Sequence, residues 1–214
     1  MNRGKFITLE GIEGAGKSTV ARIVCESLRA RGLSVLATRE PGGTPLAERV
    51  RQIVLERGTE SLSPVTETLL MFAARALHVD NVIRPALARG EWIVCDRFTD
   101  ATRAYQGSAR GVASTLIEQL AQAVHGDLAP DLTLLLDLPV AAGLARARAR
   151  TGAVSDRFEA ETVTFFEQVR AGYLAIARGE PGRVQVIDAA APLEEVEHQV
   201  SLRLALLSIS RALA

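Results

Sequence analysis

Several features that are common in other classes of protein are missing from this sequence of 214 residues. Its 25 basic residues are balanced by 25 acidic ones. The net charge is therefore zero and gives no sign of a surface that binds nucleic acid or a membrane. Only two cysteines are present, Cys25 and Cys95, far apart and without metal-ligand spacing, which predicts small core residues in a reducing compartment. The longest apolar run, residues 132–145, is too short to span a bilayer and contains Asp137. The start of the chain lacks the apolar segment of a secretory signal, and together these absences favour a cytoplasmic protein.

A glycine-rich segment near the start of the chain carries the clearest signal. Residues 11–18 read G-I-E-G-A-G-K-S, a complete G-x-x-x-x-G-K-[ST] pattern between a strand-like run and a helix-like run. The candidate nucleotide-binding residues are Gly11, Ile12, Glu13, Gly14, Ala15, Gly16, Lys17, Ser18 and Thr19. In such a loop the glycines allow a tight turn whose N–H groups point at phosphate oxygens, Lys17 reaches the β- and γ-phosphates, and the Ser18 hydroxyl binds Mg²⁺. The segment therefore predicts that the chain binds a nucleoside triphosphate.

Five short runs rich in aliphatic and β-branched residues alternate with helical stretches. The expected strands are residues 6–9, 33–38, 92–95, 132–138 and 184–187. Strands that alternate with helices predict a parallel sheet covered by helices on both faces. Gly32 marks the end of the first helix, and Ser63 with Pro64 marks the start of a long helix that must stop or kink before Pro85. No repeat or linker divides the chain, so we expect one α/β domain over 1–214: a doubly wound, five-stranded parallel sheet flanked by helices, with the nucleotide at the carboxyl ends of the strands.

A phosphate-binding loop alone leaves switch GTPases, ATPase motors and small-molecule kinases open. The N/T-K-x-D segment by which a GTPase reads guanine is absent. A second acid for Mg²⁺ is needed at the end of a neighbouring strand, and Asp96 follows the apolar run 92–95. Arg97, directly after it, would hold an acceptor phosphate, although the same two residues could form an ordinary ion pair at a strand end. We take Ser18 and Asp96 as the candidate metal-binding residues of a kinase.

Three arginines, Arg146, Arg148 and Arg150, fall at alternating positions just before residues 151–155. They could form a solvated helix face that stabilises the end of a helix. Alternatively, they belong to a lid at about 146–158 that closes over the triphosphate and supplies positive charge to phosphoryl transfer. Loop positions 12–15 contain no arginine, so positive charge beyond Lys17 must come from elsewhere. This absence favours the lid.

With these residues in place, the sequence resembles the bacterial thymidylate kinases, which phosphorylate dTMP to dTDP with ATP. The resemblance extends over nearly the whole chain. It is carried by residues 6–19 around the loop, 38–44 (T-R-E-P-G-G-T), 72–75 (F-A-A-R), 96–98 (D-R-F), 104–107 (A-Y-Q-G) and 156–159 (D-R-F-E). The R-E-P-G-G and A-Y-Q-G segments are not general features of phosphate-loop proteins, which makes the combination specific.

The resemblance implies roles in binding the sugar and phosphate of the acceptor. Glu13 would accept a hydrogen bond from the sugar 3′-hydroxyl, and Arg97 with Arg51 would hold the acceptor phosphate. The ring of Tyr105 would crowd the 2′ position and disfavour ribonucleotides. Glu40 lies in the segment that faces the bound monophosphate.

The resemblance also implies how the base is bound. Arg75 and Gln106 would hydrogen-bond the thymine edge, and Thr102 would line the same pocket. Several relatives carry a phenylalanine that stacks on the base four residues before the matching arginine, and here that position is Met71. Either Met71 makes a softer contact or its neighbour Phe72 does the stacking, unless both are helix core. We favour Phe72, because an aromatic platform is a common way to hold a base.

For catalysis, the resemblance implies in-line transfer of the γ-phosphoryl group of ATP with Mg²⁺. Gly14 stands where the eukaryotic form of the family has an arginine, so the catalytic arginine is expected from the lid, with Arg150 preferred to Arg146. The candidate catalytic residues are therefore Lys17, Arg97, Arg150 and Arg146.

Two alternatives stay open: a kinase for another deoxynucleotide or deoxynucleoside, and a non-catalytic nucleotide-binding regulator. The intact Lys17, Ser18 and Asp96 argue against the regulator. The expected partners are ATP and dTMP as small-molecule substrates, with no nucleic acid and no membrane. The resemblance implies a homodimer, for which the helices expected at 64–88 and 112–124 carry apolar residues.

Overall fold

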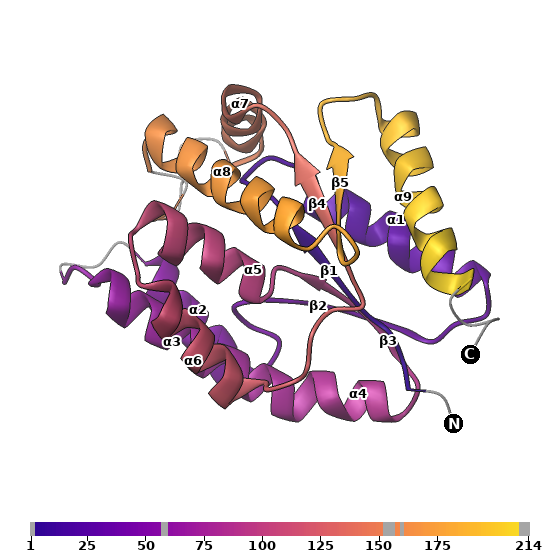
Figure 1. Ribbon diagram of the computed structural model, residues 1–214, viewed down its shortest axis with the longest axis horizontal. Helices are drawn as coiled ribbons and strands as arrows, with labels where there is room; N and C mark the ends of the chain where they lie inside the picture. Colours follow the sequence, from indigo (N-terminus) through magenta and orange to yellow (C-terminus); the bar gives the residue numbers. More distant parts are fainter. Residues whose placement is uncertain (1–2, 57–59, 152–156, 159–160, 210–214) are drawn as a thin grey trace.

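The structure is a computed structural model that describes residues 3–56, 60–151, 157–158 and 161–209, without the side chains of residues 150, 151, 208 and 209. At its centre is a five-stranded parallel sheet with the strand order β2-β3-β1-β4-β5, shown between helices in Figure 1. The strands are β1 (Phe6–Glu10), β2 (Val35–Arg39), β3 (Trp92–Asp96), β4 (Leu132–Asp137) and β5 (Val184–Asp188). All five strands expected from the sequence are thus confirmed.

Burial along the strands explains their composition. The interior strand β1 is buried at every residue, and its neighbour β4 at every residue but the last. The edge strands β2 and β5 have buried residues interspersed with more exposed ones. A strand covered on both faces accommodates polar side chains only where they find partners. Thr8 of β1 and Thr133 of β4 lie opposite each other and share a hydrogen bond of 2.7 Å between their hydroxyl groups.

Helices cover both faces of the sheet, as the doubly wound fold requires. On one face, α1 (Lys17–Ala30) lies against β1, β2 and β3, with α9 (Leu193–Ile209) beside it against β5. On the opposite face, α4 (Arg84–Ala88) contacts β3, and α8 (Val163–Gly179) contacts β4 and β5. The carboxyl ends of the strands therefore open between two helical layers, where a nucleotide was expected.

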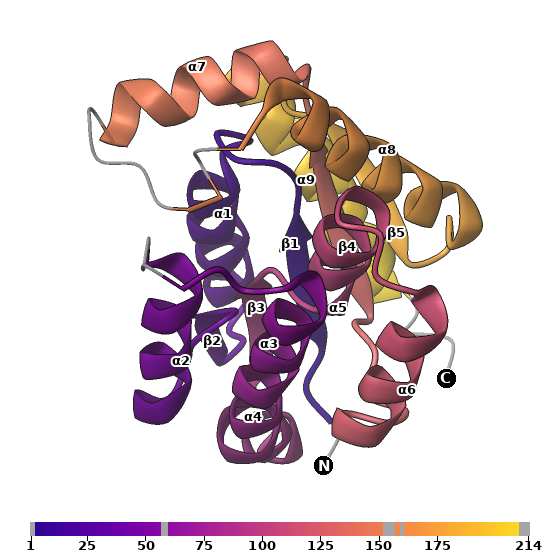
Figure 2. The same cartoon turned by 90° about the vertical axis from the view of Figure 1, so that its left-hand side faces the viewer.

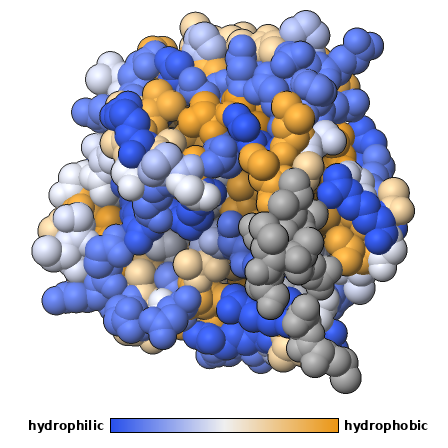
Figure 3. Space-filling view, turned by 45° about the vertical axis from the view of Figure 1, so that its right-hand side comes forward, coloured by the Kyte–Doolittle hydropathy of each residue, from blue (hydrophilic) through white to orange (hydrophobic). Residues whose placement is uncertain are grey.

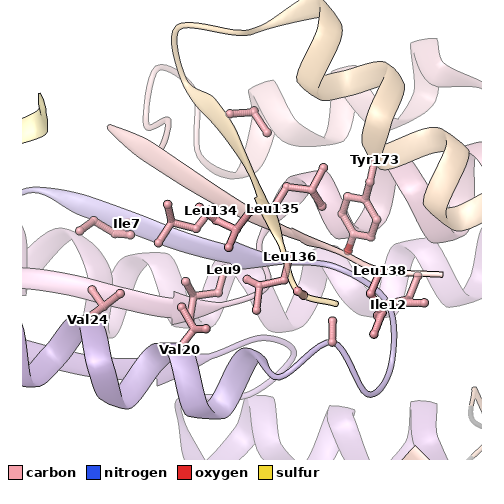
Figure 4. Packing of buried hydrophobic residues seen from close by; sticks show 14 of the residues in the cluster. Ile7, Leu9, Ile12, Val20, Val24, Leu134, Leu135, Leu136, Leu138 and Tyr173 are labelled. Atoms are coloured by element: carbon pink, nitrogen blue, oxygen red, sulfur yellow. The ribbon is translucent and has the colours of Figure 1, made fainter. Parts of the chain in front are cut away.

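The core between the sheet and the helices is mainly aliphatic. In Figure 4, Val20 and Val24 of α1 lie on one side of the strands and Tyr173 of α8 lies on the other. Ile7 and Leu9 of β1 are fully buried, and each such side chain stabilises the fold by about 1.5–3 kcal/mol. This packing fixes the end of β1 relative to the start of α1, between which the glycine-rich loop runs.

The first helix ends where the sequence predicted. Gly32 has a φ of 75°, and its N–H donates to the carbonyl oxygen of Arg29 at 2.9 Å. The N–H of Leu33 donates to the carbonyl oxygen of Leu28 at 3.2 Å. This pair of bonds is a Schellman motif, which favours glycine because its residue adopts a left-handed conformation.

The long helix expected to stop or kink before Pro85 changes its geometry just there. It starts as α3 (Pro64–His78), capped by Ser63, whose hydroxyl accepts a hydrogen bond of 3.1 Å from the N–H of Thr66. It continues through a π-helical segment, η1 (Val79–Ile83), directly into α4. Proline has no N–H and its ring clashes with the preceding turn, so the wider π turn accommodates it.

The remaining helical segments surround this frame. They are α2 (Pro45–Leu55), α5 (Thr99–Thr102), the π-helical η2 (Arg103–Ala109), α6 (Ser114–Val124) and α7 (Val140–Thr151), and Figure 2 shows α7 passing above the start of α1. On the face drawn in Figure 3, hydrophobic residues gather near the centre and hydrophilic residues border them. No helix formed by the described residues is long and apolar enough to cross a membrane.

Candidate active site

The glycine-rich loop joins β1 to α1 at the carboxyl edge of the sheet. Gly14 has a φ of 74°, a left-handed conformation that glycine adopts without strain. A Cβ on Gly14 would lie 2.0 Å from the carbonyl oxygen of Gly143 in α7, so the loop touches α7 backbone to backbone. The Nζ of Lys17 donates to the carbonyl oxygens of Gly11 at 3.1 Å and Ile12 at 2.9 Å. The lysine is thus held across the loop, where a bound phosphate would compete for its protons.

A polar cavity opens in front of this loop. Its lining residues are Glu13, Gly14, Gly16, Lys17, Ser18, Thr19, Arg39, Arg51, Asp96, Arg97 and Arg146. Asp96 ends β3, and its Oδ1 atom is buried and has no hydrogen-bond partner among the described residues. Arg146 reaches the cavity from α7, and its Nη1 donates to the carbonyl oxygen of Ala189 at 2.9 Å. The loop, the predicted metal-binding residues and one predicted lid arginine therefore share one cavity, which we call the donor cavity.

Glu13, Arg97 and Tyr105 form a compact hydrogen-bonded trio beside the donor cavity. Arg97 Nη2 donates to both carboxylate oxygens of Glu13 at 2.9 and 3.0 Å and to the Tyr105 hydroxyl at 3.0 Å, and that hydroxyl donates to Glu13. Burial opposes ionisation of Glu13, but the charges of Arg97 and Lys17 outweigh it and lower the pKa of this carboxyl. Burial, together with the charge of Glu13, raises the pKa of Tyr105 well above its usual value. The trio is therefore a carboxylate, a guanidinium and a neutral phenol.

The backbone of Arg97 is held in an unusual conformation. Its φ of 72° is rare for a residue other than glycine and costs on the order of 1–3 kcal/mol. The buried carboxyl of Glu10 accepts from the N–H of Phe98 at 2.8 Å and from the Tyr173 hydroxyl at 2.7 Å, and that hydroxyl accepts from Arg97 Nη1 at 3.1 Å. Burial, with the charge of Asp100, raises the pKa of Glu10 to about 8 despite the opposing charge of Arg97. Glu10 and Tyr173 thus support Arg97 from behind, although no sequence pattern predicted a role for either residue.

A second, more apolar cavity lies next to the donor cavity, and we call it the acceptor cavity. Its lining residues are Glu13, Glu40, Pro41, Arg51, Leu55, Met71, Arg75, Arg97, Phe98, Ala101, Thr102, Tyr105, Gln106 and Phe158. The structure therefore brings every predicted acceptor-binding residue except Phe72 to one cavity. The residues come from the glycine-rich loop, α2, α3, α5, η2, the segments that follow β2 and β3, and the segment before α8, which explains why no short motif contains them.

Three hydrogen bonds hold the side chain of Arg75 in the acceptor cavity. Its Nε donates to Glu40 at 2.7 Å, and its Nη2 donates to the carbonyl oxygen of Phe98 at 3.1 Å and to the Thr102 hydroxyl at 3.2 Å. Glu40 is itself held by His78, with 3.0 Å between Oε1 and Nδ1. The remaining nitrogen, Arg75 Nη1, is buried and has no partner among the described residues. An unsatisfied buried donor is costly, so this atom fits an acceptor supplied by a ligand.

A buried carboxylate that the sequence analysis missed lies behind Gln106. Glu67 on α3 accepts from Gln106 Nε2 at 2.6 Å, from Arg110 Nε at 3.0 Å and from Arg157 Nη2. Arg110 also pairs with Glu161 at 2.8 Å. Because these partners are far apart in the sequence, no local pattern identifies Glu67.

Phe72 does not reach the acceptor cavity, which corrects the preference for this residue. It is 2% exposed and packs with Val112, Ile117 and Ala121 in a small core between α3 and α6. Met71 lines the cavity instead. Residues four apart share a helical face, and Met71 stands four positions before Arg75, so the helix directs Met71 and not its neighbour to the cavity.

The two cavities adjoin each other. Glu13, Arg51 and Arg97 line both of them. A phosphate bound at Arg97 from the acceptor side would therefore face phosphates bound at Lys17 and Ser18 from the donor side.

The expected lid is only partly within the described residues. Arg146 and Arg148 lie on α7, Arg157 donates to Glu67, and Phe158 lines the acceptor cavity. The side chain of Arg150, the preferred catalytic arginine, and residues 152–156 lie outside the described part of the chain.

Comparison with known proteins identifies the family. The family model described as thymidylate kinase matches residues 9–200. The chain is 56% identical over 201 residues to a thymidylate kinase of Methylococcus capsulatus, covering 94% of this chain and 95% of that protein. It is 59% identical over 194 residues to a thymidylate kinase of Pseudomonas syringae pv. syringae, covering 91% of each.

The fold agrees with these sequence matches. The crystal structure of a thymidylate kinase from Ehrlichia chaffeensis superposes with a TM-score of 0.76 at 33% identity, covering 95% of this chain and 99% of that one. The matches span the glycine-rich loop, both cavities and the strands between them, and the chain belongs to the thymidylate kinase family.

Proposed function

We propose that the chain transfers the γ-phosphoryl group of ATP to the phosphate of dTMP at the junction of its two cavities, giving ADP and dTDP. The observation that carries this proposal is that Glu13, Arg51 and Arg97 line both cavities, so two phosphate-bearing substrates would meet there. Membership of the thymidylate kinase family supports the identity of both substrates.

On the donor side, the N–H groups of the loop and Lys17 would bind the β- and γ-phosphates of ATP. Among the described residues, no group of three or more His, Cys, Asp or Glu side chains could hold a metal ion by itself. This fits Mg²⁺, which usually takes one or two carboxylates and completes its shell with phosphates and water. The Ser18 hydroxyl and the unpaired Oδ1 of Asp96 are the atoms that would hold it, and it would neutralise charge on the phosphates.

On the acceptor side, Arg97 and Arg51 would hold the phosphate of dTMP. Glu13, kept ionised by Arg97 and Lys17, would accept from the sugar 3′-hydroxyl, and the neutral ring of Tyr105 would exclude a 2′-hydroxyl. Burial beside Arg97 keeps these groups in place before the substrate binds, which reduces the entropic cost of positioning.

The base would lie against Met71 with its polar edge toward Arg75 and Gln106. Arg75 Nη1, the unpaired donor, would bind the O4 atom of thymine, and Thr102 and Glu40 would fix the direction of this guanidinium. A methyl group in a pocket is worth about 10- to 200-fold in discrimination, so dUMP should be a weaker substrate rather than an excluded one.

No residue need form a covalent intermediate, because the acceptor is already an anion. Catalysis would come from positioning and charge stabilisation, with Lys17 and a lid arginine acting on the transferring group. Arg146 reaches the donor cavity, and Arg150 follows one turn later on the same helix. We also propose that the chain works as one domain with a lid at about 146–158.

We propose that the active form is a homodimer joined through α2 and α3. Two exposed leucines and two other aliphatic residues lie on these adjacent helices. They are Leu46 (49% exposed), Ile53 (52%), Val65 (45%) and Leu69 (48%). The helices α2 and α3 contact each other, so the four side chains lie on adjacent helices. Apolar groups gathered on a surface favour association.

ADP release with ATP and Mg²⁺ tests the proposed function against a panel of dTMP, dUMP, dCMP, dAMP, dGMP and UMP. We expect the highest kcat/KM with dTMP, a lower value with dUMP and almost none with UMP. Better turnover of another monophosphate would overturn the assignment of the acceptor cavity, and tight ATP binding without any turnover would support a regulator.

A further inference from the structure

Glu67 occupies a position that the proposed reaction does not use. Its side chain is buried, and it is absent from the lining of the acceptor cavity. Three donor groups converge on its two oxygens: the amide nitrogen of Gln106 and the guanidinium groups of Arg110 and Arg157. A buried carboxylate in this setting is well satisfied, so its removal would release all three donors.

The contact with Glu67 decides which way the Gln106 amide points. A side-chain amide has a donor end and an acceptor end of nearly equal shape, so its orientation depends on its partners. The carboxylate oxygen 2.6 Å away already accepts from Arg110, which offers donors only. The Gln106 atom facing Glu67 must therefore be its nitrogen, which leaves the amide oxygen for the cavity that Gln106 lines.

An acceptor at this position distinguishes the pyrimidines. Thymine and uracil present an N3–H donor next to the O4 acceptor, whereas cytosine presents an N3 acceptor next to an amino donor. The Gln106 oxygen and the unpaired Arg75 Nη1 together match the first pattern and oppose the second. A site built to hydrogen-bond one pattern rejects the other strongly, because its buried groups are left unpaired.

We propose that Glu67 is a specificity-determining positioning residue, which holds the Gln106 amide so that its oxygen reads the N3–H of the acceptor base. This inference rests on the proposed function, because it assumes that the acceptor cavity binds a pyrimidine monophosphate. Glu67 acts through Gln106 and does not touch the substrate.

A competing, purely structural role for Glu67 makes a different prediction. Through Arg157, Glu67 also fixes the backbone beside the acceptor cavity, since Arg157 Nε donates to the carbonyl oxygen of Val54 at 3.0 Å. The next residue, Phe158, and the neighbouring Leu55 both line the cavity. Loss of this wall would weaken the binding of every nucleotide to a similar extent. A change in the orientation of the Gln106 amide would instead alter the ratio of kcat/KM between nucleotides.

The variant Glu67→Gln tests the proposal because it keeps the size of the side chain. Its single amide oxygen cannot serve all three donors, and an NH₂ group facing Gln106 would favour the flipped amide. We expect the ratio of kcat/KM for dTMP to that for dCMP to fall at least about 10-fold, the value of one good hydrogen bond of 1.4 kcal/mol or more. Equal losses for both substrates, or no loss, would overturn the inference.

Two further variants sharpen the test. Glu161→Gln removes the other carboxylate on Arg110 without touching Gln106, and it should leave the ratio unchanged. The double variant Glu67→Gln with Gln106→Glu exchanges the two side chains. The amide at position 67 can then donate to the carboxylate at position 106, which presents an acceptor oxygen to the cavity. We expect it to recover part of the dTMP preference lost in Glu67→Gln, and no recovery would count against amide orientation.

A measurement on the unaltered protein covers the case in which Glu67→Gln does not fold. The side-chain amide protons of Gln106, followed by ¹⁵N-edited NMR, should exchange slowly with solvent because they are held by a buried carboxylate. Rapid exchange would overturn the inference. If the unaltered enzyme does not prefer dTMP in the substrate panel, the proposed function fails; if it does and Glu67→Gln keeps the ratio, only this inference fails.

Discussion

The donor and acceptor cavities lie side by side but are built in different ways. The donor cavity takes six of its eleven lining residues from one short segment, 13–19, which contains most of the glycine-rich loop. The acceptor cavity is formed by side chains from several distant segments, held by buried ion pairs such as Glu40 with Arg75. A site centred on one loop depends on local conformation, whereas a site assembled from distant side chains depends on the packing of the whole fold.

The largest effect is expected from Lys17→Ala, which removes the main side-chain charge of the donor loop. A cation that stabilises the transferring phosphoryl group contributes about 10³–10⁵-fold to kcat. We expect a loss in this range with little change in the Kd for dTMP, measured by steady-state kinetics and calorimetry. Lys5→Ala, which only breaks a partly exposed pair with Asp131, is the matched control, and near-normal turnover of Lys17→Ala would contradict the scheme.

Met71→Ala and Phe72→Ala separate binding from stability within the acceptor region. Phe72 is buried in the core between α3 and α6, so its truncation should lower the free energy of unfolding by about 3–5 kcal/mol. Met71 lines the cavity, so its truncation should raise the KM for dTMP more than it lowers stability. Urea unfolding and dTMP kinetics on both variants check this, and a larger KM change in folded Phe72→Ala than in Met71→Ala would contradict the assignment of Met71. The Phe72 ring lies 4.7 Å from the Arg75 guanidinium, so a small KM change in Phe72→Ala is expected through Arg75.

Gly14→Ala tests the backbone dependence of the donor cavity. The new Cβ would lie 2.0 Å from the Gly143 carbonyl oxygen, and a left-handed residue other than glycine costs on the order of 1–3 kcal/mol. The loop must then move away from α7, so we expect kcat/KM for ATP to fall about 10-fold or more, with a smaller change in dTMP binding. Gly32→Ala is the control for backbone strain without the clash, because Gly32 has a φ of 75°, its Cβ would meet no atom within 4 Å, and it lines neither cavity.

The last prediction concerns Glu10 and the dependence of stability on pH, and it leaves both cavities unchanged. Burial raises the pKa of Glu10 to about 8 in the folded protein, well above the ordinary value of a glutamate carboxyl, 4.5. Between these values the folded state holds a proton that the unfolded chain has released, so the free energy of unfolding falls as pH rises, by up to about 1.4 kcal/mol per pH unit.

Glu10→Gln removes this contribution while keeping the shape of the protonated side chain. Urea unfolding at pH values from 5 to 8 should therefore show a flatter dependence for Glu10→Gln than for the unaltered protein. Parallel slopes would mean that Glu10 is already ionised in this range.

The same contrast between the cavities explains what the sequence could predict. The donor loop was predicted residue by residue because its chemistry lies in one contiguous segment. Asp96 was predicted because a carboxylate at the end of an apolar run marks the carboxyl edge of a parallel sheet. The acceptor residues came from a family resemblance, since their common cavity exists only after α3, η2 and the strand ends pack together.

The errors and omissions also have physical causes. Phe72 was preferred for its ring, although the helical period already placed Met71 on the face of Arg75. Glu67 and Glu10 were missed because their partners are distant in the sequence: Gln106 is 39 residues from Glu67, and Tyr173 is 163 residues from Glu10. A buried carboxylate of this kind resembles any other acidic residue until its tertiary contacts are known.

The sharing of Glu13, Arg51 and Arg97 between the cavities has a thermodynamic consequence. A substrate that fills one cavity fixes side chains on which the other substrate depends. Binding free energies are reciprocal, so whatever factor dTMP imposes on the dissociation constant of ATP, ATP must impose on that of dTMP. The order in which the two substrates bind therefore changes the route to the ternary complex but not its stability. In a molecule that joins both nucleotides covalently, the same coupling free energy would contribute to the affinity of a single ligand.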